Sequence, residues 1–147
     1  MATRSTIALE YADGTVGQVY CHWDGYLDNN GKILLKHYKD PFKLRELIDL
    51  GDLSSLRPSV GVQHDFDDRD AGENECTFYG RDRGESGTEA KTFKDFADYV
   101  ENHQHEEYEY ILRKDGNWYV KAYSRPYVLL ADAIANELIE AELAEDQ

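Results

Sequence analysis

The sequence predicts a single α+β domain over residues 1–147, with a mainly antiparallel sheet and three to four helices. Two pairs of β-rich segments are each joined by an Asp-Gly dipeptide, which favours a tight hairpin turn. Other segments carry apolar residues at helical spacing. The composition, with 41% hydrophobic and 12% aromatic residues, is typical of a chain that folds around its own core.

The predicted strands share an enrichment in β-branched and aromatic residues. They are residues 6–11, 15–23, 60–66, 76–80, 108–113 and 118–123. The first two are joined across Asp13-Gly14 and the last two across Asp115-Gly116, so each pair predicts a hairpin. Residues 81–88 mix glycine, charge and hydroxyl groups and are expected to form a loop.

The predicted helices share apolar positions three and four residues apart. They are residues 32–38, 40–51, 92–100 and 130–141. Asp40 followed by Pro41 is a typical helix start, and Gly51 a typical stop. In residues 92–100, Phe93, Phe96 and Val100 should lie on the buried face. The last helix is expected to be acidic and amphipathic, because its glutamates lie mostly off the apolar stripe.

The acidic charge is concentrated in the second part of the chain. The formal net charge is −14; residues 1–64 hold 8 acidic and 7 basic side chains, whereas residues 65–147 hold 22 and 9. This balance disfavours direct binding to nucleic acid or to an anionic membrane, since both require a basic surface. Carboxylates spaced along a surface can instead take the place of DNA phosphates in a basic groove. The residues expected to form such a surface are Asp65, Asp67, Asp68, Asp95, Asp98, Glu101, Glu137, Glu140 and Glu142.

The sequence suggests a cytosolic protein. Two cysteines are too few for a disulfide scaffold and fit a reducing compartment. No segment has the pattern of a targeting signal, and the longest apolar stretch is far too short to span a membrane. A cytoplasmic location is therefore expected.

Potential metal ligands occur around both cysteines. They are Cys21, His22, His64, Asp65, Asp67 and Cys76. Their spacing matches no zinc finger, and the adjacent Cys21 and His22 would point to opposite faces of a strand. A buried thiol and a surface imidazole explain these residues more simply. We therefore expect no metal ion and no cofactor there.

The segment Gly-Arg-Asp-Arg-Gly-Glu at residues 80–85 is a candidate anion site. Arginine forks bind phosphate or carboxylate bidentately, and flanking glycines let a ligand approach the backbone. The ligand-binding residues of this alternative are Trp23, Tyr26, Tyr79, Arg81 and Arg83. The simpler interpretation is that both arginines pair with nearby acidic side chains. No serine lies in a nucleophile-elbow context, so no catalytic residue is predicted and an enzyme is disfavoured.

Several local strings resemble a group of small phage and prophage proteins of unassigned function. The main ones are Tyr-Cys-His-Trp-Asp-Gly-Tyr at residues 20–26 and Thr-Phe-Tyr-Gly-Arg-Asp-Arg-Gly-Glu at residues 77–85. The acidic C-terminal helix is the part least like that group. The resemblance implies a phage accessory protein acting in the bacterial cytosol, and it transfers no catalytic residue.

These observations lead to one main functional prediction and two alternatives. The main prediction is a non-enzymatic accessory protein whose acidic half mimics nucleic acid, binding and inhibiting a host nucleic-acid-handling protein. The first alternative is a module that binds or processes a nucleotide-like anion at residues 80–85. The second is a minor virion or assembly component. The oligomeric state is left open.

Overall fold

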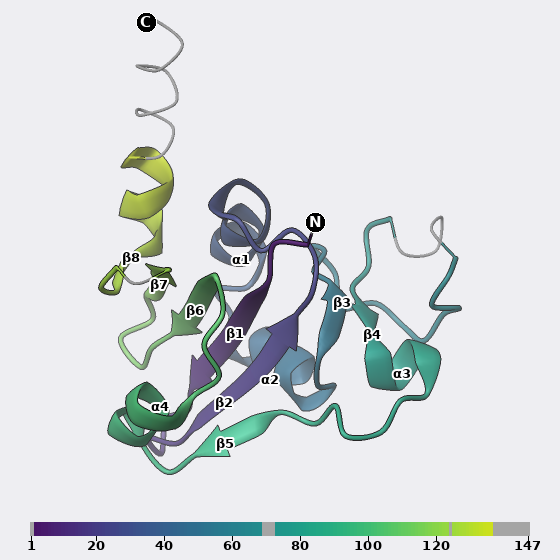
Figure 1. The fold of residues 1–147 in the computed structure, drawn as a ribbon, viewed down its shortest axis with the longest axis horizontal. Coiled ribbons are helices and arrows are strands. Elements are labelled where there is room, and N and C mark those ends of the chain that lie inside the picture. The colour runs from purple at the N-terminus through teal and green to yellow at the C-terminus, as the bar shows by residue number, and fades with distance from the viewer. Residues whose placement is uncertain (1, 69–72, 124, 137–147) are drawn as a thin grey trace, which may run out of the picture.

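The computed structural model describes residues 2–68, 73–123 and 125–136. In this part of the chain one eight-stranded sheet has the order β4-β3-β2-β1-β6-β7-β8, and β5 pairs with β2 (Figure 1). The strands are β1 (Ser5–Glu10), β2 (Val16–Cys21), β3 (Leu53–Ser55), β4 (Thr77–Phe78), β5 (Lys91–Phe93), β6 (Tyr108–Leu112), β7 (Trp118–Ala122) and β8 (Val128–Leu129). The helices are η1 (Leu27–Gly31), α1 (Lys32–His37), α2 (Pro41–Asp49), α3 (Tyr79–Arg83) and α4 (Phe96–Asn102), and residues 130–136 are helical as well.

Both predicted hairpins are confirmed. β1 and β2 pair antiparallel, and the backbone N–H of Tyr11 donates to the carbonyl of Thr15 at 2.8 Å to close the turn. β6 and β7 pair in the same way, with the N–H of Arg113 donating to the carbonyl of Asn117 at 3.1 Å. In both cases the Asp-Gly dipeptide and the β-rich segments on either side of it favour the same structure, a hairpin.

The α+β class is confirmed, but the sheet is mixed where a mainly antiparallel one was predicted. β1 pairs parallel with β6, and β2 pairs parallel with β3 at a single register position. The first strands of the two hairpins are thus neighbours at the centre of the sheet. Hairpin signals are local and fix only pairing within each hairpin, so they leave the direction of one hairpin relative to the other undetermined.

The core lies on both faces of the sheet. On one face, Ile7 and Leu9 of β1 pack with α1, α2 and Leu130. On the other face, Ala8 of β1 packs with Tyr99 of α4. This alternation along β1 is the two-residue period of a strand, and every residue of β1 is buried because both faces are covered.

The helix α2 forms where the sequence predicts it. The side chain of Asp40 accepts the N–H of Phe42 at 3.0 Å and so caps the helix, with Pro41 in the first turn. Leu44, Leu47 and Ile48 are buried against the sheet. The short helix predicted at residues 32–38 is also present, as α1.

The second half of the chain departs from several expectations. Residues 79–83, expected as strand end and loop, form helix α3, and residues 60–66 form no strand. The helix predicted at residues 92–100 begins only at Phe96, because Asp95 caps it and Phe93 belongs to β5. Its buried residue is Tyr99, whereas Val100 is 47% exposed. The last predicted helix is helical over residues 130–136, and its remaining positions lie outside the described residues.

Candidate metal centre

The acidic residues predicted to bind a partner do not gather in one place. Asp65, Asp67 and Asp68 lie in the segment between β3 and β4, beside α3. Asp95, Asp98 and Glu101 lie at α4, and Figure 1 shows α3 on the right of the view and α4 on the left, on opposite sides of the molecule. Glu137, Glu140 and Glu142 lie outside the described residues. The described carboxylates therefore form two separate clusters.

Two of the acidic residues at α4 also stabilise that helix. Asp95 accepts the N–H of Asp98 at 2.8 Å, and Asp98 accepts the N–H of Lys94 at 3.0 Å. The bond from Lys94, followed by the side-chain bond from Asn102, lowers the pKa of Asp98. These carboxylates are thus partly committed to capping α4.

The two arginines of residues 80–85 have different environments. The Nε–H and both amino groups of Arg81 donate to the carboxylate of Asp82 and to the carbonyls of Val60, Gly61 and Cys76, at 2.9 to 3.2 Å. All five N–H groups of Arg81 are therefore occupied, and its role is structural. Arg83 is more exposed and lies 5.0 Å from the ring of Phe66.

A cavity beside Trp23 has an acidic lining, which disfavours binding of an anionic ligand. Its volume is about 660 Å³, and Arg57 is the one basic residue among its described lining residues. Its acidic lining residues are Asp24, Asp67, Asp68 and Glu73. Tyr26, Tyr79, Arg81 and Arg83 do not line it, so the structure does not bring the five predicted ligand-binding residues together at this cavity.

The cysteines are buried singly in the core. The thiol of Cys21 contacts Asn30, and burial raises its pKa to about 12. The thiol of Cys76 lies 3.4 Å from the hydroxyl of Tyr38. Within the described ranges, neither cysteine belongs to a group of three potential metal ligands.

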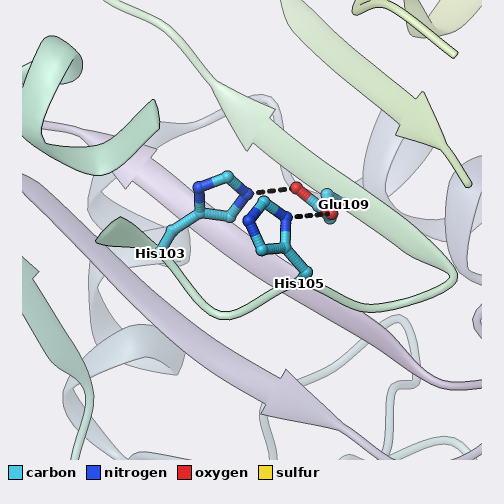
Figure 2. Close-up of side chains that lie close together, drawn as sticks. All are labelled: His103, His105 and Glu109. Atoms are coloured by element: carbon cyan, nitrogen blue, oxygen red, sulfur yellow. Dashed lines mark hydrogen bonds and ion pairs between the residues drawn. The ribbon is translucent and has the colours of Figure 1, made fainter. Parts of the chain in front are cut away.

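A different cluster has the donor set of a metal site. His103 follows directly after α4, His105 lies in the loop to β6, and Glu109 lies on β6 (Figure 2). One ligand atom from each lies within 4.8 Å of the others, and this is the one such group of three in the part of the chain that the structure describes. Figure 2 shows both imidazole rings turned toward the two oxygens of the Glu109 carboxylate.

The ring of His103 is held from both sides. Its Nδ1 lies 2.5 Å from the carbonyl oxygen of Tyr99, so this nitrogen carries a proton and donates it. Its Nε2 faces Oε1 of Glu109 in direct contact. A metal-binding histidine usually donates its second ring N–H to a carbonyl in this way, which turns the remaining nitrogen toward the metal.

Glu109 is buried at the centre of the cluster. Its Oε2 lies 3.4 Å from Nδ1 of His105 and 3.9 Å from Nζ of Lys121, its partner across the strand pair β6–β7. Tyr127 donates to Oε1 at 3.3 Å. Burial by itself would raise the pKa of Glu109, but the bond and the charge of His103 outweigh it, so the pKa is lowered. The carboxylate is therefore ionised, as a metal ligand must be.

The loop that carries both histidines is fixed to the sheet by Gln18 of β2. The side-chain amide of Gln18 donates to the carbonyl of Gln104 at 3.1 Å and accepts its N–H at 3.2 Å. Gln104 lies between the two histidines in sequence, so these bonds place both. The His103 side chain is 2% exposed and that of His105 is 65% exposed, which leaves the cluster accessible from one side.

An unpaired hydroxyl lies next to the cluster. Thr6 is the register partner of Glu109 in the parallel pair β1–β6, so both side chains lie on the same face of the sheet. Its Oγ1 is the one buried side-chain nitrogen or oxygen in the described ranges without a hydrogen-bond partner. A buried polar atom without a partner is costly, so this hydroxyl is a polar group on the same face as the cluster that remains to be satisfied.

Sequence reasoning missed this cluster, although a signal was present. The residues read His-Gln-His-Glu-Glu-Tyr-Glu from 103 to 109, with two histidines two residues apart and a glutamate four residues further on. Because Tyr110 points to the α2 face and Ile111 to the α4 face, Glu109 points to the α4 face. Predicting the face on which Glu109 lies required the position of α4. The spacing of apolar residues placed this helix at residues 92–100, whereas it begins at Phe96.

The described residues contain no helix that is long and apolar enough to cross a membrane. Comparison of the chain with protein-family models, with curated proteins and with solved structures gives no match.

Proposed function

We propose that this chain binds a divalent transition-metal ion, with Zn²⁺ as the best fit, through His103, His105 and Glu109. The observation that carries the proposal is the convergence of three ligand atoms within 4.8 Å. Two imidazoles and one carboxylate form a set that zinc accepts. Zinc bonds of about 2.0 Å place tetrahedral ligand atoms about 3.3 Å apart, close to the 3.4 Å between His105 and Glu109.

Binding requires two changes at His103. Its Nε2, which contacts Oε1 of Glu109 directly, moves away from this oxygen, and the ion takes the place of the proton between them, while Nδ1 keeps its bond to the carbonyl of Tyr99. Three protein ligands then leave a fourth position, and the exposure of His105 opens it to water. The orphan hydroxyl of Thr6 supports this proposal, because it could bond to a water at that position.

Calorimetric titration of the metal-free protein with zinc chloride tests the proposal. One equivalent of Zn²⁺ should bind per chain. His105→Ala and Glu109→Gln should each weaken binding by at least about tenfold. His37→Ala, which removes a histidine at the end of α1, is the matched control and should bind as the wild type does.

The titration can also contradict the proposal. Equal zinc binding by wild type and His105→Ala, with circular dichroism showing both folded, would place the metal elsewhere. Absence of zinc binding by the folded wild type would leave His103 and Glu109 as a buried ion pair.

We propose as a second candidate that the acidic surface binds and inhibits a basic, nucleic-acid-handling host protein. The observation that favours it is the excess of 22 acidic over 9 basic side chains in residues 65–147. The strings similar to those of phage proteins support a bacterial cytosolic setting, which stays a prediction. Because the described carboxylates form two clusters, each would contact its partner separately.

Charge reversal tests the second candidate cluster by cluster. The tagged protein is used to capture partners from bacterial lysate, and bound proteins are released by salt and identified. Replacing Glu137, Glu140 and Glu142 by lysine should abolish capture of a nucleic-acid-binding protein. The matched variant carries lysine at Asp65, Asp67 and Asp68. Capture that both variants leave unchanged would exclude these clusters as the interface.

A further inference from the structure

A basic cavity lies at the end of the sheet where β1 and β6 end and α2 begins. Its volume is about 470 Å³, within the range of sites that hold a small organic ligand. Its residues come from the end of β1, the start of α2 and the turn after β6. None of its lining residues belongs to the metal centre.

The charge of this cavity is opposite to that of the chain. Its described lining holds four basic residues, Lys39, Arg45, Arg113 and Lys114, and one acidic residue, Glu10. The whole chain, by contrast, has 30 acidic and 16 basic residues. A local excess of positive charge in a strongly acidic protein favours an anionic ligand, because the cavity attracts what the remaining surface repels.

The single acidic side chain is already neutralised. Glu10 accepts from Nε of Arg113 at 3.1 Å and from its terminal nitrogen at 3.4 Å, and it accepts the N–H of Lys114 at 3.0 Å. Burial would raise the pKa of Glu10, but these bonds lower it. The charges of Glu10 and Arg113 therefore cancel, and the remaining charge at the cavity is positive.

Three cations remain for a ligand. Among the described residues, Arg45 has a long ion pair to Asp49, at 3.9 Å, while Lys39 and Lys114 have none. The guanidinium of Arg45 lies 5.5 Å from the centre of the Tyr11 ring, which holds it at the edge of the cavity. Both lysines are exposed and reach the cavity from different segments.

The remaining lining is apolar and includes an aromatic ring without cover. Leu9 and Leu112 form the inner wall at the ends of the two central strands. Phe42, in the first turn of α2, is 81% exposed. An exposed phenylalanine at the edge of a cavity offers a flat surface against which a ligand ring can stack.

We propose that this cavity binds a small aromatic anion, with its ring against Phe42 and its phosphate or carboxylate group among Lys39, Arg45 and Lys114. The apolar wall and the cations are next to each other, so one ligand uses both. The lining residues fit either acid as the head group, and the volume accommodates a single or a fused aromatic ring. The site is independent of the metal centre, because Leu112 faces α2 whereas Glu109 faces α4.

The test is a nuclear magnetic resonance titration of the full chain with naphthyl phosphate and with naphthoate. Saturable shifts of the backbone amides of residues 9–12, 39–45 and 112–116 by at least one of them are expected. Naphthol, which lacks the charge, and inorganic phosphate, which lacks the ring, should bind at least about tenfold more weakly, since each loses one half of the contact.

Variants separate the two halves of the site. The double variant Lys39→Ala with Lys114→Ala should weaken binding of the charged probes about tenfold or more, and more at low salt than at high salt. Phe42→Ser should weaken binding at all salt concentrations. Lys32→Ala, which removes a lysine of α1 that pairs with Asp28, is the matched control and should change nothing.

Two results would overturn the proposal. One is that neither charged probe shifts the amides at the cavity. The other is that the double lysine variant and Phe42→Ser, both folded, bind the probes as tightly as the wild type does.

Discussion

The carboxylate of Asp82 accepts the backbone N–H of His64 at 3.0 Å, so one buried acid of α3 fixes a segment that lies 18 residues earlier. The other oxygen of Asp82 accepts the N–H of Phe78 at 2.8 Å, and Arg81 donates to both oxygens. The Asp82 side chain has no exposed surface. Residues 80–85, considered as an alternative ligand site, thus contain a structural ion pair between Arg81 and Asp82, as the simpler interpretation of the sequence expected.

Replacing Asp82 by asparagine should destabilise the fold by about 3 kcal/mol, because a buried arginine loses its counter-charge and backbone N–H groups lose an acceptor. Urea denaturation at neutral pH measures this free energy. Asp67→Asn, at an exposed position of the preceding segment, should stay within about 0.5 kcal/mol of wild type. Equal midpoints for the two variants would contradict the role of Asp82.

The contribution of Asp82 should also depend on pH. Burial would raise its pKa, but the bonds from Arg81, Phe78 and His64 lower it below that of an aspartate in the unfolded chain. A lowered pKa in the folded state gives stability that is complete above the unfolded value of about 3.9 and is lost as the pH falls through the folded value. The difference between wild type and Asp82→Asn should therefore shrink below about pH 4. Urea denaturation at several pH values measures it, and a constant difference would refute this account.

Tyr110→Phe should destabilise the protein by about 1 to 3 kcal/mol. The Tyr110 hydroxyl donates to the carbonyl of Gly25 at 2.6 Å, across 85 residues and in a fully buried position. Thermal unfolding measures the loss. Tyr123→Phe, at a side chain that is 58% exposed, is the control and should have little effect. A loss no larger than that of the control would show that the bond contributes no net stability.

Gln18→Ala should weaken zinc binding by about 10-fold or more without removing a ligand, because the bonds that hold Gln104 between the two histidines are lost. Calorimetric titration measures the affinity. Gln63→Ala removes an exposed glutamine elsewhere and should leave the affinity unchanged. A normal affinity in Gln18→Ala would mean that the histidines do not depend on this anchor.

Saturating zinc should raise the melting temperature of the wild type, since a ligand that binds only the folded state adds about 2.7 kcal/mol at 100 times its dissociation constant. The rise should disappear in His105→Ala. It should also shrink as the pH is lowered, because protons compete with the metal ion for the ligand atoms. A shift that persists in His105→Ala would point to a different site.

Local signals predicted the parts of the fold that depend on local chemistry. The dipeptides Asp13-Gly14 and Asp115-Gly116 predicted the two hairpins, and Asp40-Pro41 predicted the start of α2. Strands β3 and β5, by contrast, have three residues each and exist because β2 pairs with them. A segment this short carries no periodicity, so its structure depends on a neighbour that is distant in sequence.

The same reasoning explains what was missed at the metal centre. Thr92 and Phe93 fit a helical pattern, but pairing with β2 makes them a strand, and the helix begins at Phe96 instead. This shift places Tyr99 inward, and its carbonyl orients His103. The histidines were visible in the sequence, whereas the orienting carbonyl and the burial of Glu109 required the tertiary structure.

The parallel pairing of β1 with β6 also bears on how the protein folds as it is synthesised. Ile7 pairs with Tyr110, so the central strand has no partner on one edge until most of the chain has left the ribosome. Pairing over such a distance requires closure of a long loop, which slows folding. Until then the first hairpin presents an open, apolar edge on which another nascent chain could add a strand. Expression at low temperature or with chaperones should therefore favour the native protein over aggregates.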